Sequence, residues 1–262
     1  MRSPARLAVS VAALTALLLA ACGDDDQSSD TAARDGGVSG EVVVFAASSL
    51  TAAFTELGDA FTAANPDATV TFNFAASSEL VTQIGEGAPA DVFASADESN
   101  MTKLTDAGNN GSEPQTFATN LLEIIVGPDN PEGITGVEDL VNDDLIVVTC
   151  DVEVPCGKYT AKVFENAGVT VTPKSYEENV KAVVTKVTLG EADAGIVYRT
   201  DVIAAGADAA GVEIPADINV TAVYPIAATK EASNDDGAAA FIAFVLSPAG
   251  QEILAGYGFG AP

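Results

Sequence analysis

The pentapeptide Phe-Ala-Ala-Ser-Ser occurs twice in this chain, at residues 45–49 and again at residues 74–78. Each copy follows a run of apolar and β-branched residues that is typical of a buried strand, and each precedes residues with helical spacing. The chain therefore passes twice from a strand into a helix with two serines at the junction. Because a helix start carries unpaired N–H groups and partial positive charge, two such junctions favour the binding of an anion.

Serine is also a common N-cap residue, so Ser49 and Ser77 could serve only to begin their helices. Capping, however, requires no repeated Ala-Ala spacer in front of the serines. The repetition therefore favours a ligand site over two independent caps.

Strand and helix patterns alternate along the rest of the chain. Strands are predicted at residues 41–45, 68–74, 91–95, 121–126, 145–149, 194–198 and 221–229. Helices are predicted at residues 50–64, 79–85, 101–107, 159–167, 179–189, 238–246 and 248–257. This alternation predicts an α/β fold with a largely parallel sheet. Because Pro225 cannot donate a ladder hydrogen bond, the last strand is expected to be an edge or crossing segment.

The chain begins with the pattern of a secretory signal, predicted over residues 1–22. Arg2 and Arg6 form a short basic segment, and the apolar run that follows is too short to span a membrane. Small residues then precede Cys22, as in a bacterial lipobox, which predicts that Cys22 is lipidated. An ordinary signal peptide with an incidental cysteine is the alternative. Residues 23–40 have little to bury and are expected to form a disordered tether.

The acidic balance and the missing residue types exclude several functions. Removal of the two signal arginines changes the formal net charge from −27 to −29, which argues against nucleic-acid binding. The chain has no histidine, so it offers neither a Ser-His triad nor a histidine metal ligand. A serine hydrolase would need a lysine base, and neither serine motif contains a lysine. We therefore expect no enzymatic activity and no cofactor.

Two cysteines lie in the second half of the chain. Cys150 and Cys156 are separated by five residues, unlike the cysteines of a Cys-x-x-Cys redox motif. In an oxidising setting outside the cell membrane we expect them to form a disulfide, which would hold the segment that carries Cys156. Two buried thiols are the alternative.

Several motifs follow one another in a recognisable order. They are residues 44–50, 74–78 with Leu80, 87–97, 154–157, 195–198 with Asp201, and 257–259. The ordered set resembles the periplasmic molybdate-binding proteins of ABC importers, and the resemblance covers residues 41–262. It implies a type II periplasmic binding protein fold, with two α/β lobes and the ligand in the cleft between them.

The resemblance also implies that the anion is held by neutral donors alone. Carried over motif by motif, these donors are the hydroxyls and amides of Ser49 and Ser77, the amides of Cys156 and Val180, and the hydroxyl of Tyr198. Cys156 departs from the alanine that is commoner in the family, but only its backbone amide is used. Molybdate and tungstate need only donors, whereas phosphate keeps a proton at neutral pH and requires an acceptor. Sulfate or another tetrahedral oxyanion is the alternative ligand.

The implied lobes divide the chain discontinuously. Residues 41–119 and 225–262 are predicted to form the first lobe, and residues 120–224 the second. The chain would cross between them near residues 119–126 and return near residues 221–228. A ligand that bridges the lobes would favour the closed form. The implied protein is an extracytoplasmic lipoprotein, anchored to the cell membrane and monomeric, that delivers its ligand to a membrane permease.

Overall fold

The computed structural model describes residues 37–262. The predicted signal peptide, the lipidation site Cys22 and most of the predicted tether lie outside the described residues. Among the residues described, no single helix is long and apolar enough to cross a membrane. The helices Asp235–Leu246 and Pro248–Gly256 reach that length and apolar composition only when they are counted together, and they are bent by 62° relative to each other.

Strands and helices alternate through the described residues, as predicted. The strands are β1 (Gly40–Ala47), β2 (Ala68–Ala75), β3 (Val92–Ala94), β4 (Gln115–Val126), β5 (Val147–Cys150), β6 (Ser175–Glu177), β7 (Ala194–Tyr198), β8 (Ala210–Glu213) and β9 (Thr221–Ala228). The α-helices are α1 (Thr51–Ala64), α2 (Ser77–Gly85), α3 (Glu98–Asp106), α4 (Pro155–Ala167), α5 (Val180–Thr188), α6 (Arg199–Ala205), α7 (Asp235–Leu246) and α8 (Pro248–Gly256). Every predicted element is present, whereas β6, β8 and α6 were not predicted.

The strands form a mixed sheet in the order β2-β1-β3-β9-β4-β7-β5-β6, with β8 paired to β4. β1 is parallel to β2 and β3, and β5 is parallel to β6 and β7. β4 and β9 are antiparallel to each other and to their other neighbours. The prediction of a largely parallel sheet is therefore wrong for the middle of the sheet. Parallel neighbours need a crossover helix, but β4 and β9 pair as long segments that run in opposite directions.

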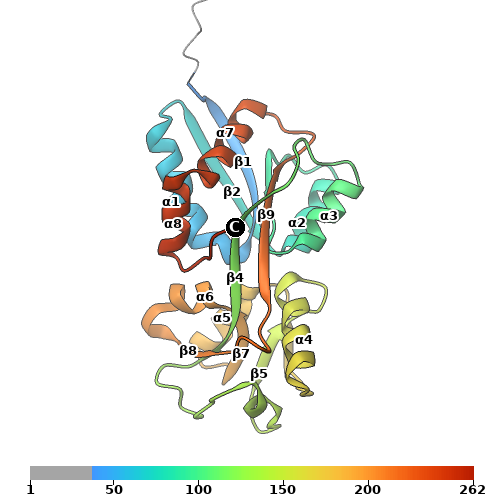
Figure 1. Ribbon diagram of the computed structural model, residues 1–262, viewed down its shortest axis with the longest axis vertical. Coiled ribbons are helices and arrows are strands. Elements are labelled where there is room, and N and C mark those ends of the chain that lie inside the picture. The colour runs from blue at the N-terminus through green and yellow to red at the C-terminus, as the bar shows by residue number, and fades with distance from the viewer. Residues whose placement is uncertain (1–36) are drawn as a thin grey trace, which may run out of the picture. The chain divides into compact units, whose positions relative to one another are not determined.

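The fold has two lobes, and Figure 1 shows β4 and β9 running between them. One lobe contains β1, β2 and β3 with helices α1, α2, α3, α7 and α8, and the other contains β5 to β8 with helices α4, α5 and α6. β9 pairs with β3 at residues 226–228, and β4 pairs with β7 at residues 122–126. The chain thus leaves the first lobe along β4 and returns along β9. Pro225 lies in this returning strand, as expected of a crossing segment.

An aromatic cluster joins the C-terminal helices to the first lobe. Phe54 of α1 lies with its ring centroid 5.5 Å from that of Phe117 in β4, and Phe61 lies 5.4 Å from Phe241 of α7. All four rings are buried, and buried aromatic side chains contribute strongly to the stability of a core. This packing explains why the end of the chain completes the lobe that the beginning of the chain builds.

Candidate functional site

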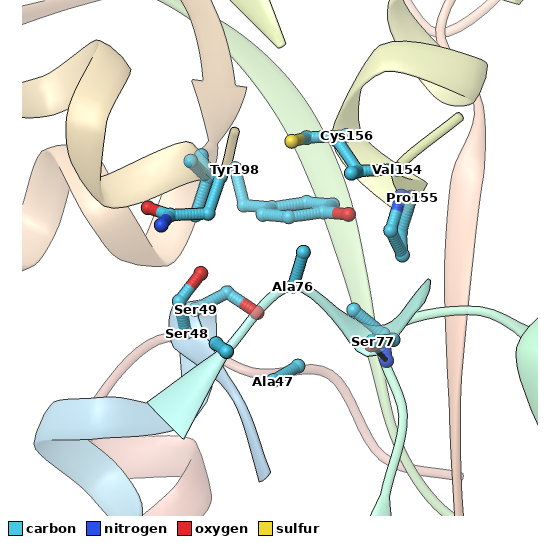
Figure 2. Close-up of a pocket in the computed structure, with 13 residues that line it drawn as sticks. Ala47, Ser48, Ser49, Ala76, Ser77, Val154, Pro155, Cys156 and Tyr198 are labelled. Carbon is cyan, nitrogen blue, oxygen red and sulfur yellow. Dashed lines mark hydrogen bonds between the residues drawn. The ribbon is translucent and has the colours of Figure 1, made fainter. Parts of the chain in front are cut away.

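A small cavity lies between the lobes, with a volume of about 10 Å³, which is roughly the room of one water-sized sphere. Its walls come from the ends of β1, β2 and β7 and from the starts of α2, α4 and α5. All five residues predicted to bind the ligand line this cavity, namely Ser49, Ser77, Cys156, Val180 and Tyr198. Figure 2 labels all of them except Val180. The remaining lining residues are Ala47, Ser48, Ala75, Ala76, Ala96, Val154, Pro155 and Asn179. No lining side chain carries a charge.

The pairing of β1 with β2 explains how serines from different places in the two repeated motifs come to lie side by side at the cavity, which Ser48 also lines. The motifs repeat with an offset of 29 residues, but the strands pair with an offset of 28, so that Ala47 lies opposite Ala75. Two residues beyond this last pair lie Ser49 and Ser77. The register therefore brings together the second serine of the first copy and the first serine of the second copy.

Neither serine serves as a helix cap. The N-cap of α2 is Ala76 and that of α1 is Leu50, and no side-chain cap hydrogen bond is formed at either. The Oγ of Ser77 instead accepts a hydrogen bond from the amide of Ala96 at 3.0 Å, and the Oγ of Ser49 lies 3.0 Å from the hydroxyl of Tyr224. The capping interpretation of these serines is therefore wrong, and both hydroxyls are held by the protein at the wall of the cavity.

The second lobe presents two helix starts to the cavity. Pro155 is the first residue of α4 and has no N–H, so the amide of Cys156 lies at the start of the helical donors. Val180 is the first residue of α5, and the side chain of Asn179 accepts a hydrogen bond from Ala182 rather than from Val180. First-turn amides have no acceptor within their own helix. The amides of Cys156 and Val180 can therefore donate to a ligand in the cavity.

Tyr198 ends β7, and its ring packs edge-on against those of Tyr159 and Tyr224, at centroid distances of 6.4 and 5.9 Å. Among the residues that the structure describes, the Tyr198 hydroxyl is the one buried side-chain polar atom without a hydrogen-bond partner. Burial raises the pKa of Tyr198 well above its usual value, so the phenol keeps its proton. A buried donor without a partner is costly, and a ligand that accepted its proton would remove that cost.

The charged residues near these segments point elsewhere. Glu178 is exposed, and Glu177 accepts a hydrogen bond of 2.6 Å from Lys186, so neither carboxylate lines the cavity. Partial burial alone would raise the pKa of Glu177, but hydrogen bonds from Lys186 and Ser175 hold it below its usual value. Both acids precede α5 and do not lie in its first turn. The described walls of the cavity therefore offer an anion donors and no charged side chain.

Lys158 forms an ion pair that joins the lobes beside the cavity. Its Nζ lies 3.1 Å from the carboxylate of Asp97 and 2.8 Å from the hydroxyl of Ser99. Asp97 is the N-cap of α3 in the first lobe, whereas Lys158 belongs to α4 in the second. The sequence alone does not indicate this pair, because residues 61 positions apart share no local pattern.

The predicted disulfide between Cys150 and Cys156 is present, with a Cα–Cα distance of 5.7 Å. It links the end of β5 to the first turn of α4 and so restrains the cavity segment that carries the Cys156 amide. This confirms the pairing of the two cysteines.

Replacing both cysteines with serine is expected to lower the free energy of unfolding by about 2 kcal/mol, because a crosslink that closes a short loop restricts the unfolded chain. Urea unfolding of the native protein and of the Cys150→Ser/Cys156→Ser variant measures the difference. Native protein treated with a reductant is the control, since it should behave like the double variant. Identical unfolding midpoints in all three samples would contradict this role of the bridge.

Comparisons with known proteins agree with this geometry. Residues 42–260 match the family described as bacterial extracellular solute-binding protein. The chain is 40% identical over 252 residues to the molybdate-binding protein ModA of Mycobacterium tuberculosis, covering 96% of each chain. This confirms the resemblance that the ordered motifs indicated.

Solved structures confirm the two-lobed binding-protein fold. The periplasmic molybdate-binding protein of Azotobacter vinelandii aligns with a TM-score of 0.74 at 21% identity, over 84% of this chain and 99% of that chain. The sulfate-binding protein SubI of Mycobacterium tuberculosis aligns with a TM-score of 0.76 at 18% identity, over 84% of this chain and 86% of that one. Both likenesses concern the fold alone. From its sequence match and its cavity between two lobes, the chain belongs to the bacterial extracellular solute-binding proteins, a family of binding proteins and not of enzymes.

Proposed function

We propose that this protein captures molybdate outside the cytoplasm and delivers it to an ABC importer. The observation that carries the proposal is a buried, uncharged cavity whose polar walls are hydroxyls and amides, including the partnerless hydroxyl of Tyr198. The proposed ligand contacts are Ser49, Ser77, Cys156, Val180 and Tyr198. The name of the relative with 40% identity supports molybdate as the ligand.

The donor set suits an oxyanion that carries no proton. Oriented neutral dipoles stabilise an anion without a mobile countercharge, and molybdate is a fully deprotonated tetrahedron at neutral pH. Tungstate has the same charge and shape, so we expect it to bind as well. Sulfate offers the same acceptors on a smaller tetrahedron, so the dimensions of the cavity would have to exclude it.

Closure of the lobes would couple binding to transport. Two of the proposed contacts lie in the first lobe and three in the second, so only the closed form brings all five together. A bound anion would therefore stabilise that form. The proposed lobes are residues 41–119 with 225–262, and residues 120–224. A monomer tethered to the membrane through Cys22 and residues 23–40 would present the closed form to a permease.

Titration calorimetry of the purified protein with molybdate, tungstate, sulfate and phosphate tests the proposal. Molybdate and tungstate are expected to bind tightly, and sulfate and phosphate much more weakly. A melting scan with each anion gives an independent readout, because tight binding raises stability. Sulfate binding as tightly as molybdate would overturn the assignment in favour of the sulfate alternative.

The ion pair between Lys158 and Asp97 is expected to favour the closed form. Lys158→Met should lower molybdate affinity by about two- to fivefold at low salt. This matches the small free energy that a partly exposed ion pair contributes. The loss should shrink as salt rises, because ions screen the pair. Lys162→Met, which removes an exposed pair within α4, is the matched control and should leave affinity unchanged. Equal molybdate affinities of Lys158→Met and native protein at low salt would contradict a role of this ion pair in stabilising the closed form.

A further inference from the structure

Tyr224 lies behind the cavity and touches one of its walls. It belongs to the returning strand β9, is fully buried, and does not line the cavity. Its hydroxyl lies 3.0 Å from the Oγ of Ser49, and by distance alone either oxygen could be the donor. The direction of this hydrogen bond decides whether the hydroxyl of Ser49 can donate a hydrogen bond to the ligand or can only accept one.

Asn120 of β4 determines that direction. The backbone amide of Leu121 donates to Oδ1 of Asn120 at 3.0 Å, which fixes the orientation of the side-chain amide. The Nδ2 group of Asn120 then faces the hydroxyl of Thr200 at 2.9 Å and that of Tyr224 at 3.5 Å. An amide nitrogen is only a donor, so the oxygen of Tyr224 accepts from Asn120.

The proton of Tyr224 must therefore go to Ser49. If Ser49 donated to Tyr224 instead, the phenol proton would be buried without an acceptor among the described residues, which is costly. Burial raises the pKa of Tyr224, so the phenol does not lose this proton. With its oxygen accepting from Tyr224, Ser49 has its own proton left for the cavity.

Ser77 is held in the same way. Its Oγ accepts from the amide of Ala96 at 3.0 Å, so its proton is also left for the cavity.

We propose that Tyr224 is a positioning residue that fixes Ser49 as a donor, so that the first lobe selects oxyanions without a proton. This inference rests on the proposed function, because it concerns the same cavity.

Tyr224→Phe removes the donor to Ser49 while keeping the aromatic ring. We expect molybdate affinity to fall by about tenfold, the effect of roughly one lost hydrogen bond. The affinity for phosphate should not fall in parallel, because the freed oxygen of Ser49 can accept the proton of phosphate. The ratio of molybdate affinity to phosphate affinity should therefore decrease. Thr200→Val is the matched control, since it removes a buried hydroxyl from the other side of Asn120. It should change neither the affinity nor the ratio.

A double-mutant cycle separates this role from a general loss of packing. Tyr224→Phe in a Ser49→Ala background should have little further effect on molybdate affinity, because Tyr224 acts through Ser49. Melting of each unliganded variant reports whether it folds. If Tyr224→Phe does not fold, Asn120→Leu removes the amide that orients Tyr224 and should lower affinity in the same direction.

The outcomes distinguish this inference from the proposed function. Native protein that binds no molybdate overturns the proposed function, whatever the variants do. Native protein that binds molybdate, together with equal losses from Tyr224→Phe in both backgrounds or an unchanged ratio of molybdate to phosphate affinity, overturns the role of Tyr224 alone.

Discussion

Replacing Tyr198 with phenylalanine is expected to weaken molybdate binding and, at the same time, to stabilise the unliganded protein. The variant loses a hydrogen bond to a charged ligand, worth about 1.5–3 kcal/mol, or roughly 10- to 100-fold in affinity. In the unliganded protein the same hydroxyl is buried without a partner, so its removal relieves a desolvation cost of about 1 kcal/mol. The melting temperature should then rise by about 2–4 °C.

Calorimetry with molybdate and a melting scan without it measure the two effects on Tyr198→Phe. Tyr257→Phe is the control, because it loses a surface hydrogen bond to Glu56, and neither residue lines the cavity, so affinity should be unchanged. The opposite signs are the informative result. A fall in both affinity and melting temperature would mean that the hydroxyl stabilises the fold, which contradicts its assignment as a ligand donor.

Ser77→Ala is expected to lower molybdate affinity by about 10- to 100-fold, again through loss of a hydrogen bond to a charged ligand. Ser78→Ala, one residue along the same helix, should change affinity by less than about twofold, as expected of a partly exposed residue outside the cavity. The two substitutions lie at adjacent positions, and each removes one serine hydroxyl oxygen. Calorimetry therefore tests the register of the site directly.

The amide of Ala96 loses its acceptor in Ser77→Ala, so stability must be followed in parallel. Molybdate affinities should be compared only at temperatures at which both serine variants are folded. A larger affinity loss in Ser78→Ala than in Ser77→Ala would show that the proposed alignment of the two repeated motifs is wrong.

Much of the fold followed from local patterns in the sequence. Alternating strand and helix signals located every long element, among them α5, whose buried residues Val180, Val183 and Val187 recur at helical spacing. The direction of β4 and β9 did not follow, because strand direction is set by pairing with distant partners and leaves no mark on periodicity. The two serine motifs predicted a site, but the choice between neighbouring serines depends on the resemblance. The strand register adds that Ser49 and Ser77 follow paired strands at equivalent positions.

The residues near the cavity that the sequence did not indicate were missed for one physical reason. Tyr224 and Asn120 read as ordinary members of crossing strands, and Asp97 reads as a helix cap, which it also is. Each acquires a role near the cavity only through a partner more than 60 positions away. No spacing rule within one segment could have predicted such contacts.

The division of the cavity between two lobes has a consequence for release. Each lobe alone offers only part of the proposed donor set, and none of the described residues that line the cavity carries a charge. On the proposed donor set, tight binding would therefore require the closed arrangement and would be lost when the lobes separate. A partner that pulled the lobes apart would not need to compete for the anion or change its chemistry, because opening alone would weaken binding.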